Sequence, residues 1–196
     1  SSSSAASDVY KRQGSNIDMN GTELILDADG DSSITSDTDD QIDFKAGGTD
    51  VMAMSSTGLT ITNASNDTQL TLKSTDADAN VGPVLDLYRN SASPADNDRI
   101  GSVTFRGRND NSQDVDYAVF DVFATDVSDG TEDVEFDIRT VKGGAESSSV
   151  TFLGTETVFN QAGANIDFRV EGVAEANVFL VDAANDNVLI GCTALP

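Results

Sequence analysis

The sequence of 196 residues has no histidine and no tryptophan, and it has one cysteine. Without histidine, a Ser-His-Asp or Cys-His catalytic group and any histidine-containing zinc site are excluded. The single cysteine, Cys192, permits no internal disulfide and is too isolated to indicate a metal site, so we interpret it as a small near-terminal residue. A carboxylate pair, as in glycoside hydrolases, is the remaining catalytic option. Because no tryptophan is available to stack on a sugar, we expect no enzymatic activity.

Basic residues are also scarce, since 11 Lys and Arg stand against 34 Asp and Glu and give a net charge of −23. Such a chain lacks the basic patch that displaces counterions from a nucleic acid backbone, and an anionic membrane surface would repel it. No stretch approaches the ~18 apolar residues of a membrane-spanning helix. We therefore expect neither nucleic acid nor a membrane as a partner.

The residues that are abundant favour turns and short strands. Most of the acids are Asp, which favours turns and disfavours helices, and Gly, Ser, Thr and Asn fill the connections. High charge and low hydrophobicity are also the signature of disorder. However, 38% of the residues are apolar and they are grouped into strand-sized strips. We predict an all-β fold with no helix.

The pattern of these strips divides the chain into segments. Residues 1–13, "SSSSAASDVYKRQ", resemble translated sequencing-adapter read-through, and we interpret them as a non-native scar. In residues 14–74, short apolar strips begin at positions 24, 34, 42, 51, 59 and 70. This loose period, broken by Asp, Gly, Ser and Asn, predicts successive short strands, which we call the β-repeat shaft.

Residues 75–153 contain longer, alternating strands and predict an antiparallel β-sandwich. About five strands are expected, in the stretches "VLDLY", "GSVTFRGR", "DYAVFDVFA", "DVEFDIRT" and "VTFLG". "DYAVFDVFA" is apolar on both sides, which predicts a central strand covered on both faces. Residues 154–196 return to short strips, and we interpret them as a β-repeat segment that is truncated in an internal fragment of a longer protein.

The stretch "DADGD" is the candidate metal site of the sequence. Asp27, Asp29 and Asp31 alternate around Gly30, and calcium prefers such oxygen ligands. However, the glycine is at loop position 4 rather than 6, and position 12 is Thr38 rather than a bidentate glutamate. We therefore predict an acidic, solvated turn with no metal and no cofactor. A weakly bound cation that relieves charge repulsion is the open alternative.

Three longer stretches carry a resemblance to a known group of proteins. Residues 21–61, "GTELILDADG…STGLTI", "SPADNDRIGSVTFRGRND" and "VFNQAGANIDFRVEG" resemble segments of tail-fibre and related appendage proteins of tailed bacteriophages. The resemblance covers roughly residues 15–192 and implies a homotrimer in which each short strip meets its copies across a threefold axis. The β-repeat shaft is then expected to be a trimeric β-prism or β-helix-like structure that flanks the β-sandwich. It further implies a location in the virion, contact with other virion proteins, and a host surface glycan or receptor as a candidate partner. The virion-attachment end, receptor-binding tip and chaperone domain of such fibres have no counterpart in these stretches.

The function expected from this resemblance is a structural segment of a tail fibre or other virion appendage that supports host attachment. One alternative is a module of a bacterial surface adhesin with acidic, calcium-stiffened β-repeats. Another is the shaft of a polysaccharide depolymerase. The gene surroundings discriminate the first two, because an adhesin requires a signal peptide and a sorting sequence.

Overall fold

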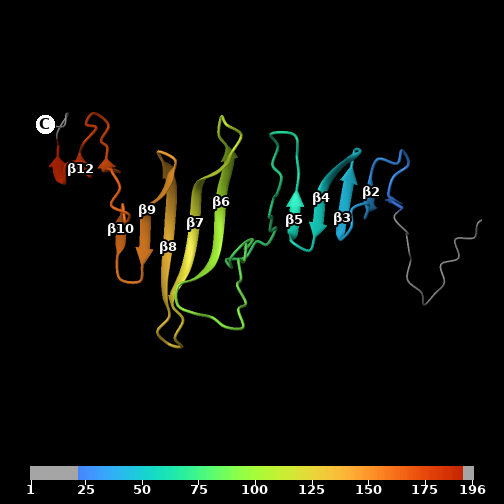
Figure 1. Ribbon diagram of the computed structural model, residues 1–196, viewed down its shortest axis with the longest axis horizontal. Helices are drawn as coiled ribbons and strands as arrows, with labels where there is room; N and C mark the ends of the chain where they lie inside the picture. The colour runs from blue at the N-terminus through green and yellow to red at the C-terminus, as the bar shows by residue number, and fades with distance from the viewer. Residues whose placement is uncertain (1–21, 192–196) are drawn as a thin grey trace, which may run out of the picture. The chain divides into compact units, whose positions relative to one another are not determined.

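The protein is all-β in the computed structural model, which describes residues 22–191. The strands in this range form three antiparallel sheets, and each strand pairs only with its neighbours in sequence (Figure 1). The predicted all-β class and the predicted lack of helices are confirmed for the described residues. None of these residues forms a helix that could cross a membrane. The predicted scar, residues 1–13, and Cys192 lie outside the described residues.

The chain divides into two compact units, which meet in sequence between Val84 and Leu85. The first unit contains one sheet, here named sheet A. The second contains two, here named sheet B and sheet C.

Sheet A is a five-stranded meander built from the strips of the predicted β-repeat shaft. Its strands are β1 (Leu24–Ile25), β2 (Ser33–Thr35), β3 (Gln41–Ala46), β4 (Thr49–Ser55) and β5 (Gly58–Ile61). The first five apolar strips are therefore strands, as predicted. The sixth strip, Leu70 with Leu72, is not a strand, so that part of the prediction is wrong.

Tight glycine turns set the register in both units. Ala46 pairs with Thr49, and the two residues between them, Gly47 and Gly48, have φ angles of 57° and 74°. Two successive positive φ angles are typical of a type I′ turn, whose twist matches that of the flanking strands. The chain uses the same device at Gly143–Gly144 between the eighth and ninth strands.

Sheet B occupies most of the region that was predicted to be a sandwich. Its strands are β6 (Asp98–Arg108), β7 (Asp114–Asp126), β8 (Asp133–Lys142), β9 (Ala145–Leu153) and β10 (Thr157–Phe159), in the spatial order β10-β9-β8-β7-β6. Four of the five predicted strands are present. The predicted strand "VLDLY", residues 84–88, is not formed, and β10 follows the predicted limit at residue 153.

Sheet B is a single layer within the chain rather than two stacked sheets. The predicted central strand is β7, which is paired on both edges by β6 and β8. One of its faces is covered, because Val119 is 3% exposed. The other face is not, because Phe120 is 38% exposed. The expectation that both faces are covered is therefore wrong for the unit that contains sheet B, which supplies no second layer from its described residues.

Sheet C consists of three short strands near the end of the described range. They are β11 (Phe168–Val170), β12 (Phe179–Asp182) and β13 (Asn187–Ile190). All three coincide with the short strips predicted after residue 154. A ring contact joins sheet B to sheet C, because the centroids of Phe159 and Phe168 are 4.5 Å apart.

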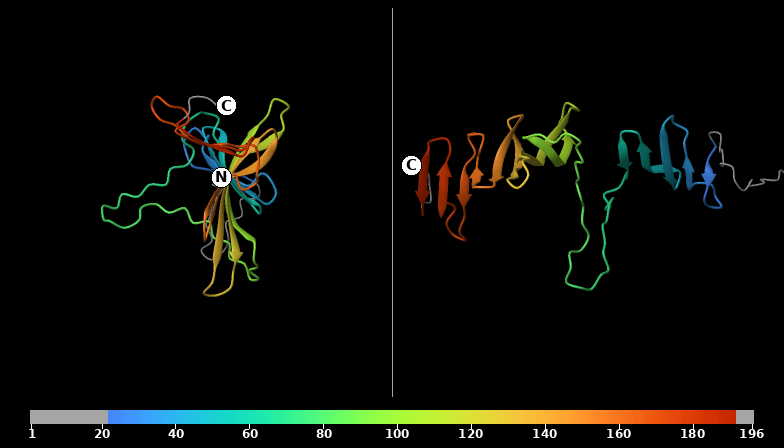
Figure 2. Two further views of the ribbon diagram at one scale, coloured as in Figure 1. Left: turned by 90° about the vertical axis from the view of Figure 1, so that its left-hand side faces the viewer. Right: turned by 90° about the horizontal axis from the view of Figure 1, so that it is seen from below.

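Residues 62–97 connect β5 to β6 without forming a strand. Figure 2 shows this stretch as a ribbon without strand arrows. It contains both of the predicted strands that the structure lacks, at Leu70–Leu72 and at Val84–Tyr88. Neither stretch has a partner strand in the described part of the chain.

Candidate functional site

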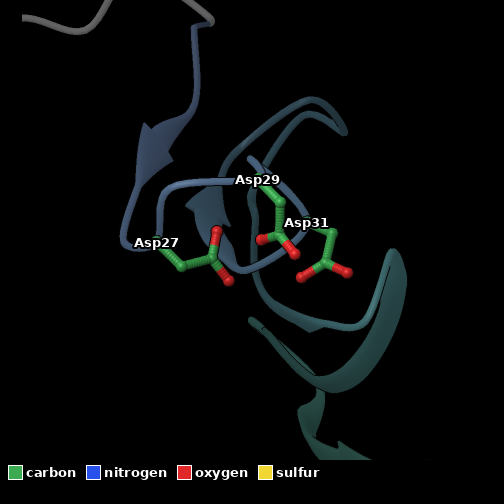
Figure 3. A group of neighbouring side chains, drawn as sticks. All are labelled: Asp27, Asp29 and Asp31. Carbon is green, nitrogen blue, oxygen red and sulfur yellow. The ribbon is translucent and has the colours of Figure 1, made fainter.

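The predicted acidic turn lies between β1 and β2, and all three of its carboxylates are exposed. Figure 3 shows the side chains of Asp27, Asp29 and Asp31 around the same space, and one oxygen of each lies within 4.8 Å of the others. The structure thus brings the three predicted residues together. A cation could be held by three carboxylate oxygens at such spacing, but exposed acidic turns commonly exist without one.

One acid of this turn, Asp27, also stabilises the turn itself. Asp27 Oδ1 accepts hydrogen bonds from the backbone N–H groups of Gly30, at 3.1 Å, and Ser32, at 3.2 Å. Hydrogen bonding from Ser32, by its side chain and then its backbone, and from the backbone of Gly30 lowers the pKa of Asp27. Asp27 therefore stabilises the turn by satisfying backbone donors, which is the role of an Asx-type turn residue.

A second acidic cluster, which the sequence analysis did not predict, is buried in the middle of sheet B. Asp121 and Asp137 are directly opposite each other on β7 and β8, and they are 1% and 2% exposed. Arg99 pairs with Asp121 and Arg139 with Asp137, with an Nη2–Oδ2 distance of 3.0 Å in the second pair. The Oγ1 of Thr151 donates a hydrogen bond of 2.6 Å to Asp137. The two guanidinium groups thus compensate the two buried charges.

The environment of the cluster shifts the pKa values of two carboxyl groups, Asp137 and Glu135, in opposite directions. Burial raises the pKa of Asp137, but hydrogen bonds from Thr151, Ser148 and Arg139 outweigh this effect and leave that pKa below its ordinary value. Burial and then the neighbouring charge of Asp137 raise the pKa of Glu135. A cluster in which each buried carboxylate is paired with a guanidinium stabilises the sheet.

The sequence feature that could have predicted this cluster is a single acidic residue within an otherwise apolar strand. Asp121 interrupts "AVFDVFA", where a carboxylate would be costly unless it were paired. Alternation within "DVEFDIRT" places Asp137 and Arg139 on one face of the strand, but it does not show that Asp121 and Arg99 join them across β6–β8. Sheets A and C also bury one acid each, Asp43 at 2% and Asp182 at 4% exposed.

The opposite face of each sheet is apolar and open. In sheet A, one row of cross-strand partners runs through all five strands: Leu24, Ile34, Phe44, Met52 and Ile61. In sheet B, four phenylalanine rings follow one another across β6–β9 with centroid distances of 5.8, 6.2 and 5.6 Å: Phe105, Phe120, Phe136 and Phe152. In sheet C, the corresponding residues are Phe168, Val170, Phe179, Val181, Val188 and Ile190. We call these surfaces the open faces.

The open faces leave the chain with almost no core of its own. Among the described residues, two hydrophobic side chains are buried, Val119 and Leu180, whereas 27 large hydrophobic side chains are exposed. A soluble monomer rarely exposes a continuous apolar surface of this extent, and such a surface marks an interaction site. The open faces are therefore the strongest candidate functional surface in the described residues.

Two apolar hollows lie on these faces. The hollow on sheet A has a volume of about 620 Å³ and is lined by side chains that include Phe44, Met52 and Ile61. The hollow on sheet B has a volume of about 360 Å³ and is lined by side chains that include Val103, Phe120 and Phe136. The hollow on sheet B is lined almost entirely by apolar side chains, whereas the hollow on sheet A is also lined by the polar residues Thr49, Thr62, Asn63, Thr68 and Gln69.

Comparisons with known proteins identify no relative: no family model, no curated protein and no solved structure matches this chain.

Proposed function

We propose that the chain is a structural, non-enzymatic segment of a tail fibre or other virion appendage of a tailed bacteriophage, and that it works as a homotrimer. The observation that carries this proposal is that every sheet is one layer with an open apolar face and a polar face. A sheet of this kind needs a second layer to bury its apolar side. Neither unit provides one from its own described residues.

A trimer supplies the missing layer by symmetry. Three copies around a threefold axis turn the same open face toward the axis, and the three sheets together enclose one apolar centre. Each buried phenylalanine ring removes about 150–250 Å² from water, and the gain is about 25 cal/mol for each Å². The polar faces and the Asp-rich turns then point to solvent, where their charge discourages sideways aggregation. An elongated spacer requires these properties and no catalytic residue.

We infer the role of this trimer from the resemblance to phage appendage proteins. It supports a place in the virion, contact with other virion proteins, and a contribution to host attachment in which a surface glycan or receptor is the final target. The length and stiffness of the sheets are then the useful properties.

A bacterial surface adhesin is the second candidate, and the Asp27–Asp29–Asp31 cluster favours it. In that case calcium would stiffen the acidic turn, and the chain would belong to a cell surface instead of a virion.

Light scattering after size exclusion, combined with circular dichroism, tests the architecture. We expect a β-rich species with three times the 20.5 kDa mass of one chain. A monodisperse monomer with the full β signal would contradict the proposal. The genes that flank the complete coding sequence test the role: neighbouring virion genes support the appendage, and a signal peptide with a sorting sequence supports the adhesin.

A further inference from the structure

The hollow on sheet A differs from the rest of the open faces, because its lining is both apolar and polar. Its volume of about 620 Å³ lies within the range of about 300–1,000 Å³ that is typical of ligand pockets. The whole lining comes from one unit of the chain, namely from β3, β4, the end of β5 and the residues that follow β5. The geometry of this hollow is therefore set within that unit.

The apolar part of the lining lies on the strands. Phe44 on β3 and Met52 on β4 are half-buried cross-strand partners, and Ile61 on β5, which is 37% exposed, pairs with Met52. Their side chains belong to one row of the open face. The ring of Phe44 offers a flat apolar surface to the C–H groups of a ligand, as a tryptophan would over a larger area.

The polar part of the lining belongs mainly to residues 62–69, which fold back beside β5. Gln69 Nε2 donates a hydrogen bond of 3.3 Å to the carbonyl of Ile61, eight residues earlier in the chain. Asn63 Oδ1 accepts hydrogen bonds from the N–H and the hydroxyl of Ser65, at 2.8 and 2.9 Å. These bonds close the stretch into a loop next to β5 and fix the orientation of both amide side chains.

The same bonds leave the other half of each amide for a ligand. Asn63 uses its oxygen and Gln69 its nitrogen, so that Asn63 Nδ2 and Gln69 Oε1 make no hydrogen bond to another described residue. Three hydroxyl groups of the lining are unpaired in the same range, those of Thr49, Thr62 and Thr68. The hollow thus offers one oriented donor, one oriented acceptor and three groups that can act as either.

The absence of charge in this lining narrows the class of ligand. None of the described residues that line the hollow is charged, although 23% of the whole chain is. A charged ligand would lose hydration there without gaining a partner, and the net charge of −23 repels anions. A wholly apolar ligand would cover the amides and hydroxyls and leave them without hydrogen bonds. The ligand that fits is neutral and has both C–H groups and several hydroxyl groups, as a sugar ring has.

We propose that the hollow on sheet A binds a neutral glycan, with one sugar ring on Phe44 and the hydroxyl groups of that ring bonded to Asn63 and Gln69. This inference rests on the proposed role in host attachment, to which it adds the class of glycan and the place of contact. Because β5 is an edge strand of sheet A, the polar part of the lining lies at the boundary of the apolar centre that three copies would enclose, not in its middle. A glycan can therefore end in the hollow while the rest of the open face packs on other copies.

Binding of the labelled full chain to a printed array of neutral and acidic oligosaccharides tests the site. We expect binding to neutral oligosaccharides and binding about tenfold weaker, or less, to acidic ones. Phe44→Leu keeps an apolar side chain but removes the ring, and Gln69→Ala removes the amide at an exposed position. Each should weaken binding by about tenfold or more, which corresponds to the loss of about one ligand contact. Circular dichroism shows that the two variants keep the β signal of the unmodified protein.

Each variant has a matched control outside the hollow. Phe105→Leu removes a ring from the open face of sheet B, and Gln113→Ala removes an amide from an exposed loop. Both controls should bind neutral oligosaccharides as the unmodified protein does. Controls that weaken binding as much as Phe44→Leu and Gln69→Ala would overturn the inference, because the effect would then not belong to the hollow.

The remaining outcomes separate this inference from the proposed function. Binding that either Phe44→Leu or Gln69→Ala leaves unchanged, a preference for acidic oligosaccharides, or no binding to any neutral one would overturn the glycan site. Light scattering on the same samples reports the assembly. A trimer without glycan binding would leave the structural role standing, whereas a single chain that binds neutral oligosaccharides through the hollow would support the site and contradict the trimer.

Discussion

At the scale of single residues, sheet B gathers its charged side chains on one side, together with Val119 and Phe123, and leaves the other side apolar. Asp121 and Asp137 are buried beneath Arg99 and Arg139, and Arg139 also lies over the ring of Phe123, 5.4 Å from its centroid. A guanidinium that contacts both a carboxylate and an aromatic face loses less hydration than an ammonium would, which suits Arg to this place. These side chains cover the polar face from within the chain, so that the face needs no further layer.

Removing the hydroxyl of Thr151 should destabilise the fold in a pH-dependent way. The pKa of Asp137 is lowered in the folded state, so that its contribution is present above the unfolded pKa of about 3.9 and is lost as pH falls through the folded pKa. Thr151→Val raises the folded pKa of Asp137 toward its ordinary value. We expect a loss of about 1–3 kcal/mol at pH 7 in urea unfolding at fixed protein concentration.

The difference between Thr151→Val and the unmodified protein should shrink as the pH falls below the ordinary Asp pKa of about 3.9 and through the lowered folded pKa of Asp137. Thr157→Val, at an exposed position of β10, is the matched control and should change stability by less than about 0.5 kcal/mol. A loss that stays the same as the pH falls would mean that packing, not the hydrogen bond, accounts for it.

The acidic turn at Asp27–Asp31 should respond little to calcium. Asp27 is already used as an acceptor for backbone N–H groups, and a site with millimolar affinity in millimolar calcium adds only about 0.4 kcal/mol. Thermal melts in chelator and in millimolar calcium should therefore nearly coincide. A large calcium-specific stabilisation that Asp29→Ala abolishes and Asp39→Ala preserves would contradict this and favour the adhesin.

At the scale of the elements, the sequence predicts a strand well where at least one of its edges finds a partner in the same chain. β1–β5 follow from short apolar strips between turn residues, and β6–β9 follow from alternation. The stretches at Leu70–Leu72 and Val84–Tyr88 have the same strand-like pattern but no neighbour to pair with. Alternation also shows which residues share a face of a strand, but it does not show what covers that face. For this reason sheet B, which is one layer, was predicted to be a two-layered sandwich.

The candidate site was predictable in part for a similar reason. Asp27, Asp29 and Asp31 are close in sequence, so that a local pattern suffices to bring them together. Asp121 and Arg99 are far apart in sequence, and their pairing depends on the register between β6 and β7, which is set by the loop at residues 109–113 and by the bulges in the β6–β7 pair. No local spacing rule contains that information.

The open face of β6 should control self-association. Val103→Asp places a carboxylate on the apolar side of the strand, where three copies would bring three charges together without partners. We expect the three-chain species to be replaced by single chains in light scattering. Thr104→Asp adds the same charge on the opposite side and should leave the mass unchanged. Equal dissociation by both variants would indicate net charge, not the face, as the cause.

At the scale of the whole molecule, a trimer must hold together against its own charge. Three chains of −23 carry −69, and the repulsion between them extends over about 30 Å at 0.01 M salt but about 10 Å at 0.1 M. The fraction of trimer should therefore rise between these two concentrations of sodium chloride, measured by light scattering at a fixed, low protein concentration. Potassium chloride should give the same curve, because screening depends on ionic strength. Dissociation by added salt would instead indicate an interface held by ion pairs.

Because every described strand pairs only with its neighbours in sequence, the width of each sheet is set by its number of strands. Strands are spaced about 4.8 Å apart, so that a gene duplication that inserts one hairpin extends a sheet by about 10 Å without changing any existing pairing. Deleting a hairpin shortens it by the same step. Such a sheet can change its reach in fixed increments during evolution while the chemistry of its faces stays the same.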